Sequence, residues 1–203
     1  MEGLWKLFNW IAKLAYLNIL WITFTLLGFI VLGIGPATSA VFSVMKKLLD
    51  EEDFPMWRVF YDYYKHHFWI ANKFMLIIVP VCCFIYLDFL FIQTLPYSFF
   101  IDHVVFTAII ILSMLMVILF SYLFATHTYF EVSYFKKIKY AALIAGINPL
   151  PTTLILLGLL IFVIILLIIP AISIFYLVSL PVCIIQLCAQ QGLKKLHGTY
   201  SLW

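Results

Sequence analysis

Between Lys139 and Lys194 the chain carries no Asp, Glu, Lys or Arg, so this long segment cannot form the surface of a water-soluble domain. A single helix over its apolar part would be about 55 Å long, nearly twice the hydrocarbon thickness of a bilayer. The chain is therefore expected to turn within the segment. Pro170 cannot continue the hydrogen-bond ladder of a helix, and it marks the expected tip of a tight helical hairpin.

The composition of the whole chain makes lipid its solvent. Of the 203 residues, 66% are hydrophobic and only 10% are charged. In hydrocarbon every backbone N–H and C=O must find its partner within the protein, which leaves helical bundles and closed barrels as spanning structures. Barrel strands alternate in hydrophobicity over roughly ten residues, whereas the apolar runs here are unbroken for about 20. The fold class is therefore an all-α, polytopic transmembrane helical bundle.

Five apolar runs qualify as spans of this single membrane domain. We expect them at about residues 14–34, 74–95, 104–124, 151–169 and 172–189. The polar segments between them give an independent check, because Lys and Arg near span ends prefer the cytoplasm. With five spans, two basic residues lie on one side, Lys6 and Lys13, and the other ten lie on the opposite side. This split predicts that the N-terminus is outside and that the C-terminus is in the cytoplasm.

The N-terminal region has two interpretations. Lys6, an apolar stretch and the Ala-Thr-Ser-Ala segment at 37–40 follow the order of a cleaved signal peptide. However, the apolar stretch exceeds the roughly 7 to 15 residues of a typical signal-peptide core. We therefore expect a mature span, preceded at residues 1–13 by an interfacial amphipathic helix.

Residues 35–73 form the largest polar segment, and we expect a cytoplasmic amphipathic helical segment because so short a stretch cannot bury a core of its own. Its second half carries an aromatic stripe with basic residues beside it: Trp57, Arg58, Phe60, Tyr61 and Tyr64. Aromatic and Arg side chains are enriched at protein interfaces, which makes this stripe a candidate partner-docking surface. The same pattern also suits a helix anchored in the headgroup region of the bilayer, so both interpretations remain open.

One stretch is characteristic of a known family. Residues 33–40 read Gly-Ile-Gly-Pro-Ala-Thr-Ser-Ala, an acidic run follows at 50–53, and an aromatic segment ends Phe-Trp-Ile-Ala-Asn at 68–72. With these features the chain resembles the YesL family of small bacterial membrane proteins, a domain of unknown function. The resemblance implies a multi-pass protein of the bacterial plasma membrane that is an accessory of carbohydrate utilisation, since family members are often encoded beside ABC-type sugar importers. It implies no catalytic residues.

The glycine-rich stretch itself is expected to be a turn between helices. Gly33 and Gly35 permit backbone conformations that other residues avoid, and Pro36 can open the next helix while Thr38 or Ser39 caps its free amides. A phosphate-binding loop would need more glycines and a Lys-Ser/Thr ending, which this stretch lacks.

Three polar residues are candidates for a functional role. Asp88 is the only ionisable residue well inside a predicted span, where a carboxylate costs at least about 2.5 kcal/mol. It is either a hydrated residue of the outer half of its span or a substrate or proton contact. His127 and Glu131 are spaced i and i+4, so they would share one face of a continuous helix as an ion pair or half of a cation site.

No cofactor or metal site is expected. The four cysteines fall in apolar runs without a second pair or a histidine at ligand spacing, and there they behave as small hydrophobic residues. The basic residues are spread over the segments between spans rather than gathered in one basic domain, so no nucleic-acid partner is expected.

Three functions compete. The favoured one is a non-enzymatic accessory or scaffold protein that binds a sugar importer or another membrane protein in the lipid bilayer. The alternative is a small transporter or permease subunit with Asp88 in its pathway, although the sequence lacks the paired Gly- or Pro-broken helices typical of many transporters. An intramembrane enzyme would need a paired nucleophile and base or a complete metal set, neither of which the sequence offers.

Overall fold

The computed structural model describes residues 2–50, 53–93, 100–130 and 133–200, and every regular element in these ranges is helical. The elements are α1 (Glu2–Leu27), α2 (Ile34–Leu49), α3 (Met56–Gln93), the π-helical turn η1 (Phe100–Val105), α4 (Phe106–Tyr129), α5 (Tyr134–Ile147), α6 (Pro149–Ile168), α7 (Ile172–Tyr176) and α8 (Ser179–Tyr200). Within the described ranges, four helices are long and apolar enough to cross a membrane: α1, α3, α4 with its lead-in turn, and α6. The chain is thus an all-α bundle with several apolar helices, as expected of a multi-pass membrane protein.

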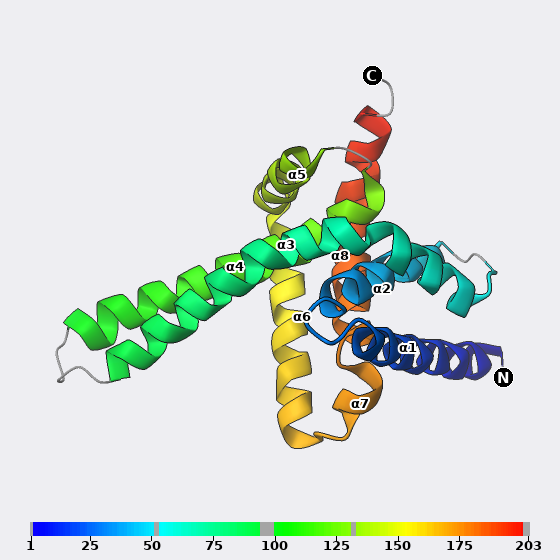
Figure 1. Ribbon diagram of the computed structural model, residues 1–203, viewed down its shortest axis with the longest axis horizontal. Helices are drawn as coiled ribbons and strands as arrows, with labels where there is room; N and C mark the ends of the chain where they lie inside the picture. Colours follow the sequence, from blue (N-terminus) through cyan, green and yellow to red (C-terminus); the bar gives the residue numbers. More distant parts are fainter. Residues whose placement is uncertain (1, 51–52, 94–99, 131–132, 201–203) are drawn as a thin grey trace.

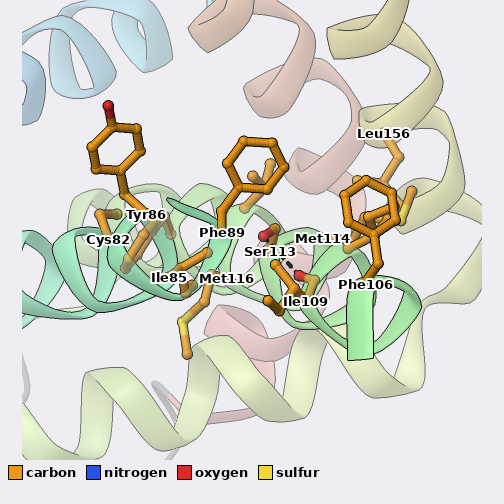
Figure 2. Close-up of a pocket in the computed structure, with 13 residues that line it drawn as sticks. Cys82, Ile85, Tyr86, Phe89, Phe106, Ile109, Ser113, Met114, Met116 and Leu156 are labelled. Carbon is orange, nitrogen blue, oxygen red and sulfur yellow. Dashed lines mark hydrogen bonds between the residues drawn. The ribbon is translucent and has the colours of Figure 1, made fainter. Parts of the chain in front are cut away.

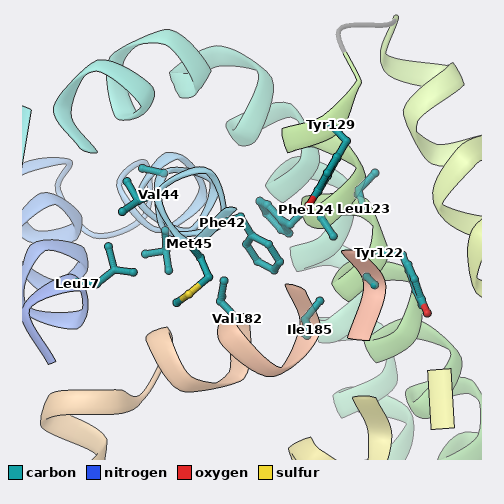
Figure 3. Packing of buried hydrophobic residues seen from close by; sticks show 14 of the residues in the cluster. Leu17, Phe42, Val44, Met45, Tyr122, Leu123, Phe124, Tyr129, Val182 and Ile185 are labelled. Atoms are coloured by element: carbon teal, nitrogen blue, oxygen red, sulfur yellow. The ribbon is translucent and has the colours of Figure 1, made fainter. Parts of the chain in front are cut away.

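α2 lies at the centre of the packed part of the molecule. It contacts α3, α8, α1 and α4, and most of its residues are buried. Figure 3 shows Phe42 and Met45 of α2 among Leu17 of α1, Phe124 of α4 and Val182 of α8. The first half of the expected amphipathic segment is therefore the core around which the other helices pack.

The α3–α4 hairpin extends away from this core. Figure 1 shows α3 and α4 as a long antiparallel pair that runs across α6 and α8, which pack against each other. The most apolar part of α3 buries none of its residues against the rest of the chain, and that of α4 buries almost none. The hairpin therefore exposes its apolar surface on most sides.

Helix boundaries differ from the expected spans in α1 and α3. α1 is one helix from Glu2 to Leu27, so the expected interfacial helix and the first span are continuous, and the helix ends before residue 34. α3 continues from the amphipathic segment into the second apolar run; at 38 residues it is about 57 Å long, more than one bilayer crossing requires. No glycine or proline separates the two halves between Met56 and Val79, which explains why the helix does not break there.

The C-terminal apolar segment turns at residues 169–171, around Pro170. The run that follows is interrupted at Leu177 and Val178, which separate α7 from α8, so residues 172–189 are not one continuous helix. The apolar part of α8, Ser179–Gln190, is shorter than a spanning helix.

The turn between α1 and α2 does not use its glycines as expected. The backbone has positive φ angles at Phe29 (55°) and Ile30 (62°), whereas no described glycine does. Gly33 instead allows close packing: an added Cβ would lie 2.9 Å from the Cα of Thr25. Thr38 and Ser39 do not cap α2 either, because their hydroxyls bond the side chains of Trp21 and His67.

Candidate functional site

The C-terminal turn of α4 is the most polar part of the buried core. Residues Ser121 to His127 are all buried, and the helix ends at Tyr129. Polar side chains from this turn make contacts in two directions. His127 faces α3 and α5, while Thr128 and Tyr129 contact α2 and α8.

The first set of contacts forms what we name the His127 cluster: Ser39, His67, His127 and Lys137, contributed by α2, α3, α4 and α5. The ammonium of Lys137 lies 2.6 Å from Nδ1 of His127. The rings of His67 and His127 have centroids 4.3 Å apart, and Nδ1 of His67 lies 2.9 Å from the hydroxyl of Ser39. His127 is 6% exposed and Lys137 is 4% exposed.

The donor set defines the tautomer of His127. With Lys137 as an ammonium, which only donates hydrogen bonds, Nδ1 of His127 accepts from Lys137 and the ring carries its proton on Nε2. That Nε2 is buried and has no hydrogen-bond partner among the described atoms. The rings of His127 and Phe74 make an edge-to-face contact, and Phe74 is itself buried. The contact with Lys137 is thus the one hydrogen bond of the His127 ring among the described atoms.

The second set of contacts, the Gln186 cluster, joins α2, α4 and α8 through Lys46, Thr128 and Gln186. Lys46 donates to the carbonyl of Thr128 at 3.1 Å and lies over the ring of Tyr129. The side-chain amide of Gln186 donates to the carbonyl of Phe42 at 3.1 Å and to the hydroxyl of Thr128 at 3.4 Å. These bonds fasten the end of α4 to α2 and α8.

The expected pair of His127 and Glu131 rests on a continuous helix, and the structure does not provide one. α4 ends at Tyr129, and Phe130 has an extended backbone with φ −125° and ψ 121°, so the i and i+4 positions no longer share a helical face. Glu131 itself lies outside the described residues. His67, Lys137 and Ser39 were not identified from the sequence, because each is on a different helix from His127.

Asp88, the other candidate, is half-buried near the C-terminal end of α3 and does not line the groove described below. No group of three His, Cys, Asp or Glu side chains in the described part of the chain lies close enough together to hold a metal ion.

The candidate docking stripe packs partly against the chain itself. Phe24 of α1 lies between the rings of the stripe, with centroid distances of 5.0 Å to Phe60, 5.1 Å to Tyr64 and 5.2 Å to Trp57. Phe60 is fully buried, whereas Trp57, Arg58 and Tyr61 are exposed. Only part of the stripe is therefore accessible to a partner.

The α3–α4 hairpin contains a groove of about 580 Å³, which we name the hairpin groove. Figure 2 shows Cys82, Phe89 and Phe106 among its lining residues, together with Leu156 of α6 at one end. The hydroxyl of Ser113 donates to the carbonyl of Ile109 one turn earlier, at 2.8 Å, so it is satisfied within its own helix. Besides Ser113, the polar groups of the lining are the hydroxyl of Tyr86 and the thiol of Cys82; the remaining lining side chains are apolar.

Comparison with known proteins agrees with the resemblance seen in the sequence. The family model described as "Protein of unknown function, DUF624" matches residues 14–89. That range covers most of α1, all of α2 and most of α3, including Ser39 and His67 of the His127 cluster. It ends before α4 and α5, which supply His127 and Lys137.

Three proteins of Bacillus subtilis (strain 168), each named as uncharacterized, are similar to the chain. YteU is 35% identical over 68% of this chain, and the match spans 61% of the length of YteU. YesL is 29% identical over 77% of this chain and 73% of its own length, and YesV is 29% identical over 73% of this chain and 71% of its own length. No solved structure matches the chain. The matches to DUF624 and to YesL and its relatives show that the chain belongs to the YesL-like family.

Proposed function

We propose that this protein is a non-enzymatic accessory of the bacterial plasma membrane that holds a second membrane protein through the hairpin groove. The observation that carries the proposal is the hairpin itself. Its two apolar helices extend from a packed core, and the side chains that line the groove between them are mostly apolar.

The occupant that suits this groove is an apolar transmembrane helix of the partner. In a bilayer, helices associate through close van der Waals packing rather than through a hydrophobic driving force, so a concave surface favours a partner that fills it. The small side chains of Cys82 and Ser113 allow such a helix to approach the groove closely. A charged substrate would find no side chain of opposite charge on this lining.

The orientation in the membrane and the identity of the partner are proposed from the sequence. The distribution of Lys and Arg supports an outside N-terminus and a cytoplasmic C-terminus. The family resemblance supports a permease subunit of an ABC-type sugar importer as the partner. The proposal includes no catalysis: Ser39 and His67 pair a hydroxyl with an imidazole, but neither of them lines the hairpin groove.

Site-specific photo-crosslinking in cells tests the proposal. A photoreactive phenylalanine at position 89, in the groove, should give one discrete protein adduct, which mass spectrometry should identify as a helical membrane protein. The same group at Leu76, which is exposed on α3 but outside the groove, serves as the control and should give lipid adducts only. If position 89 also gives only lipid adducts, the groove is filled by acyl chains and the proposal is wrong.

Identification of the adduct also decides the identity of the partner. A permease subunit of a sugar importer would support the carbohydrate role. Any other membrane protein would leave the accessory role intact and exclude the sugar importer.

A further inference from the structure

We propose that the side of α3 that faces away from the core binds the phosphates of anionic phospholipids. This outer face of α3 is defined by four residues: Arg58, Lys65, Trp69 and Leu76. None of them lines the hairpin groove, so the inference does not depend on the proposed binding of a membrane protein.

The outer face lies opposite the buried face of the same helix. Phe60, Ala71 and Phe74 are the buried residues of α3, and their spacing places them on one side of it. The residues of the outer face follow one another at intervals of 7, 4 and 7 positions, so they share the other side. All of them are exposed, with exposed fractions of 77% for Trp69 and 76% for Leu76.

The chemistry of the outer face changes along the helix. Its first two residues are basic, whereas no charged residue occurs after Lys73 until Asp88. Trp69 stands between the basic and the apolar part, and tryptophan is enriched where a helix passes from hydrocarbon to headgroups. From Leu76 onward the outer face continues into the exposed apolar surface of the hairpin. This order identifies the level at which α3 enters the hydrocarbon.

The length of α3 brings its first half to the depth of the headgroups. An upright helix of about 57 Å would exceed the full bilayer, which is about 40–45 Å thick with its headgroups. At a tilt of about 40°, the upper end of the usual range, the helix spans about 44 Å. Lys65 then lies about 9 Å beyond Lys73 along the bilayer normal, at the outer edge of the headgroup layer. Its long side chain can reach the phosphates from there.

The charge of this part of α3 complements an anionic headgroup. Between Met56 and Lys73 the helix carries three basic residues and one acidic residue, Asp62, which gives a net charge of +2 with neutral histidines. A basic residue near a membrane surface enriches anionic lipid about fivefold, and a guanidinium can donate two hydrogen bonds to one phosphate. Under the expected topology the outer face meets the cytoplasmic leaflet, the one that carries the negative surface potential.

Fluorescence quenching in lipid nanodiscs tests the proposal with the purified full-length protein. The nanodiscs contain phosphatidylcholine and phosphatidylglycerol, and bromine on the acyl chains of one of the two lipids quenches any tryptophan that this lipid contacts. Trp69→Phe, a change at an exposed position, is the reference, so the difference between the two proteins reports Trp69 alone. Per mole of lipid, brominated phosphatidylglycerol should quench Trp69 about fivefold more than brominated phosphatidylcholine.

Variants of the charged residues show whether the basic side chains cause the preference. Arg58→Gln together with Lys65→Gln should bring the ratio to about one. Quenching by phosphatidylcholine should persist in this variant, because Trp69 still lies among lipids. Asp62→Asn should raise the ratio, since it removes the negative charge, and Lys6→Gln, at an exposed lysine of α1, should leave it unchanged.

Three results would overturn the proposal. Equal quenching of Trp69 by the two lipids in the unmodified protein would show an apolar contact without a phosphate site. Absence of quenching by either lipid would show that the outer face does not meet the bilayer. A preference that survives the double substitution would show that Arg58 and Lys65 do not bind the headgroups.

Discussion

The side chain of Asn18 on α1 donates a hydrogen bond to the carbonyl of Ile174 on α7 at 2.8 Å. The side-chain oxygen Oδ1 of Asn18 accepts hydrogen bonds from the backbone N–H of Val178 at 2.9 Å and from that of Ser179 at 3.4 Å. The N–H of Val178 lies in the break before α8 and that of Ser179 begins α8, where no preceding turn of the helix can satisfy it. One fully buried asparagine thus satisfies backbone groups on both sides of the break between α7 and α8.

We predict that Asn18→Leu destabilises the protein, because each buried backbone group left unpaired costs about 1–3 kcal/mol. Unfolding by sodium dodecyl sulfate in mixed micelles measures the effect. Asn9→Leu is the matched control, since Asn9 is exposed on the same helix and should change stability little. Equal losses in the two variants would show that the bonds of Asn18 are not responsible.

The turn between α1 and α2 leads to a second prediction. An added methyl group at Gly33 would collide with the backbone of Thr25, whereas the same group at Gly146 in α5 would meet nothing within 4 Å. Gly33→Ala should therefore lower the free energy of unfolding by about 1–3 kcal/mol. Gly146→Ala should be neutral or slightly stabilising, because alanine favours a helix by up to about 1 kcal/mol over glycine. A harmless Gly33→Ala would mean that the turn can move to make room.

The sequence could predict the features of the fold that follow from local chemistry. The absence of charge after Lys139 and the position of Pro170 predict a helix, a turn and a returning chain, and α6 and α8 follow that order. The burial of α2 could not be predicted in the same way. Its apolar stripe suits a membrane surface as well as a protein core, and only the tertiary packing decides between them.

The His127 cluster was beyond the reach of local rules for a related reason. The i and i+4 rule pairs His127 with Glu131, but it assumes that the helix continues, and α4 ends two residues after His127. His127 instead contacts a residue 10 positions later on α5 and one 60 positions earlier on α3. Nothing in the spacing of these residues indicates that three helices meet at one point.

The expected topology can be tested directly. Ten of the twelve basic residues lie in segments expected inside the cell, so residue 55 should be cytoplasmic. In a cysteine-free background, Pro55→Cys should resist an impermeant thiol reagent until the cells are opened. Gly3→Cys should react in intact cells, because the N-terminus is expected outside. The reverse pattern would overturn the assigned orientation.

Asp88 provides a test of the transporter alternative. It is half-buried on α3, outside the lining of the hairpin groove. We predict that Asp88→Asn leaves protein abundance, membrane insertion and the adduct at position 89 unchanged, because a carboxylate that contacts water loses little when it becomes an amide. Loss of growth on a carbohydrate at normal abundance would instead assign Asp88 to a substrate or proton pathway.

The last prediction tests whether the partner binds to the hairpin groove or to the aromatic stripe. Phe24 packs among the rings of Phe60, Trp57 and Tyr64, so the stripe stabilises the contact between α1 and α3. Phe24→Ala should cost about 3–5 kcal/mol, as expected for a buried phenylalanine.

The double substitution Trp57→Ala with Arg58→Ala should cost less than Phe24→Ala, because both side chains are exposed, and it should leave the protein adduct at position 89 intact. Unfolding in mixed micelles and the crosslinking yield measure the two effects separately. If the double variant keeps its stability but loses the adduct, then the exposed half of the stripe contacts the partner, as its aromatic and basic composition suggests, and the groove alone is not sufficient for docking.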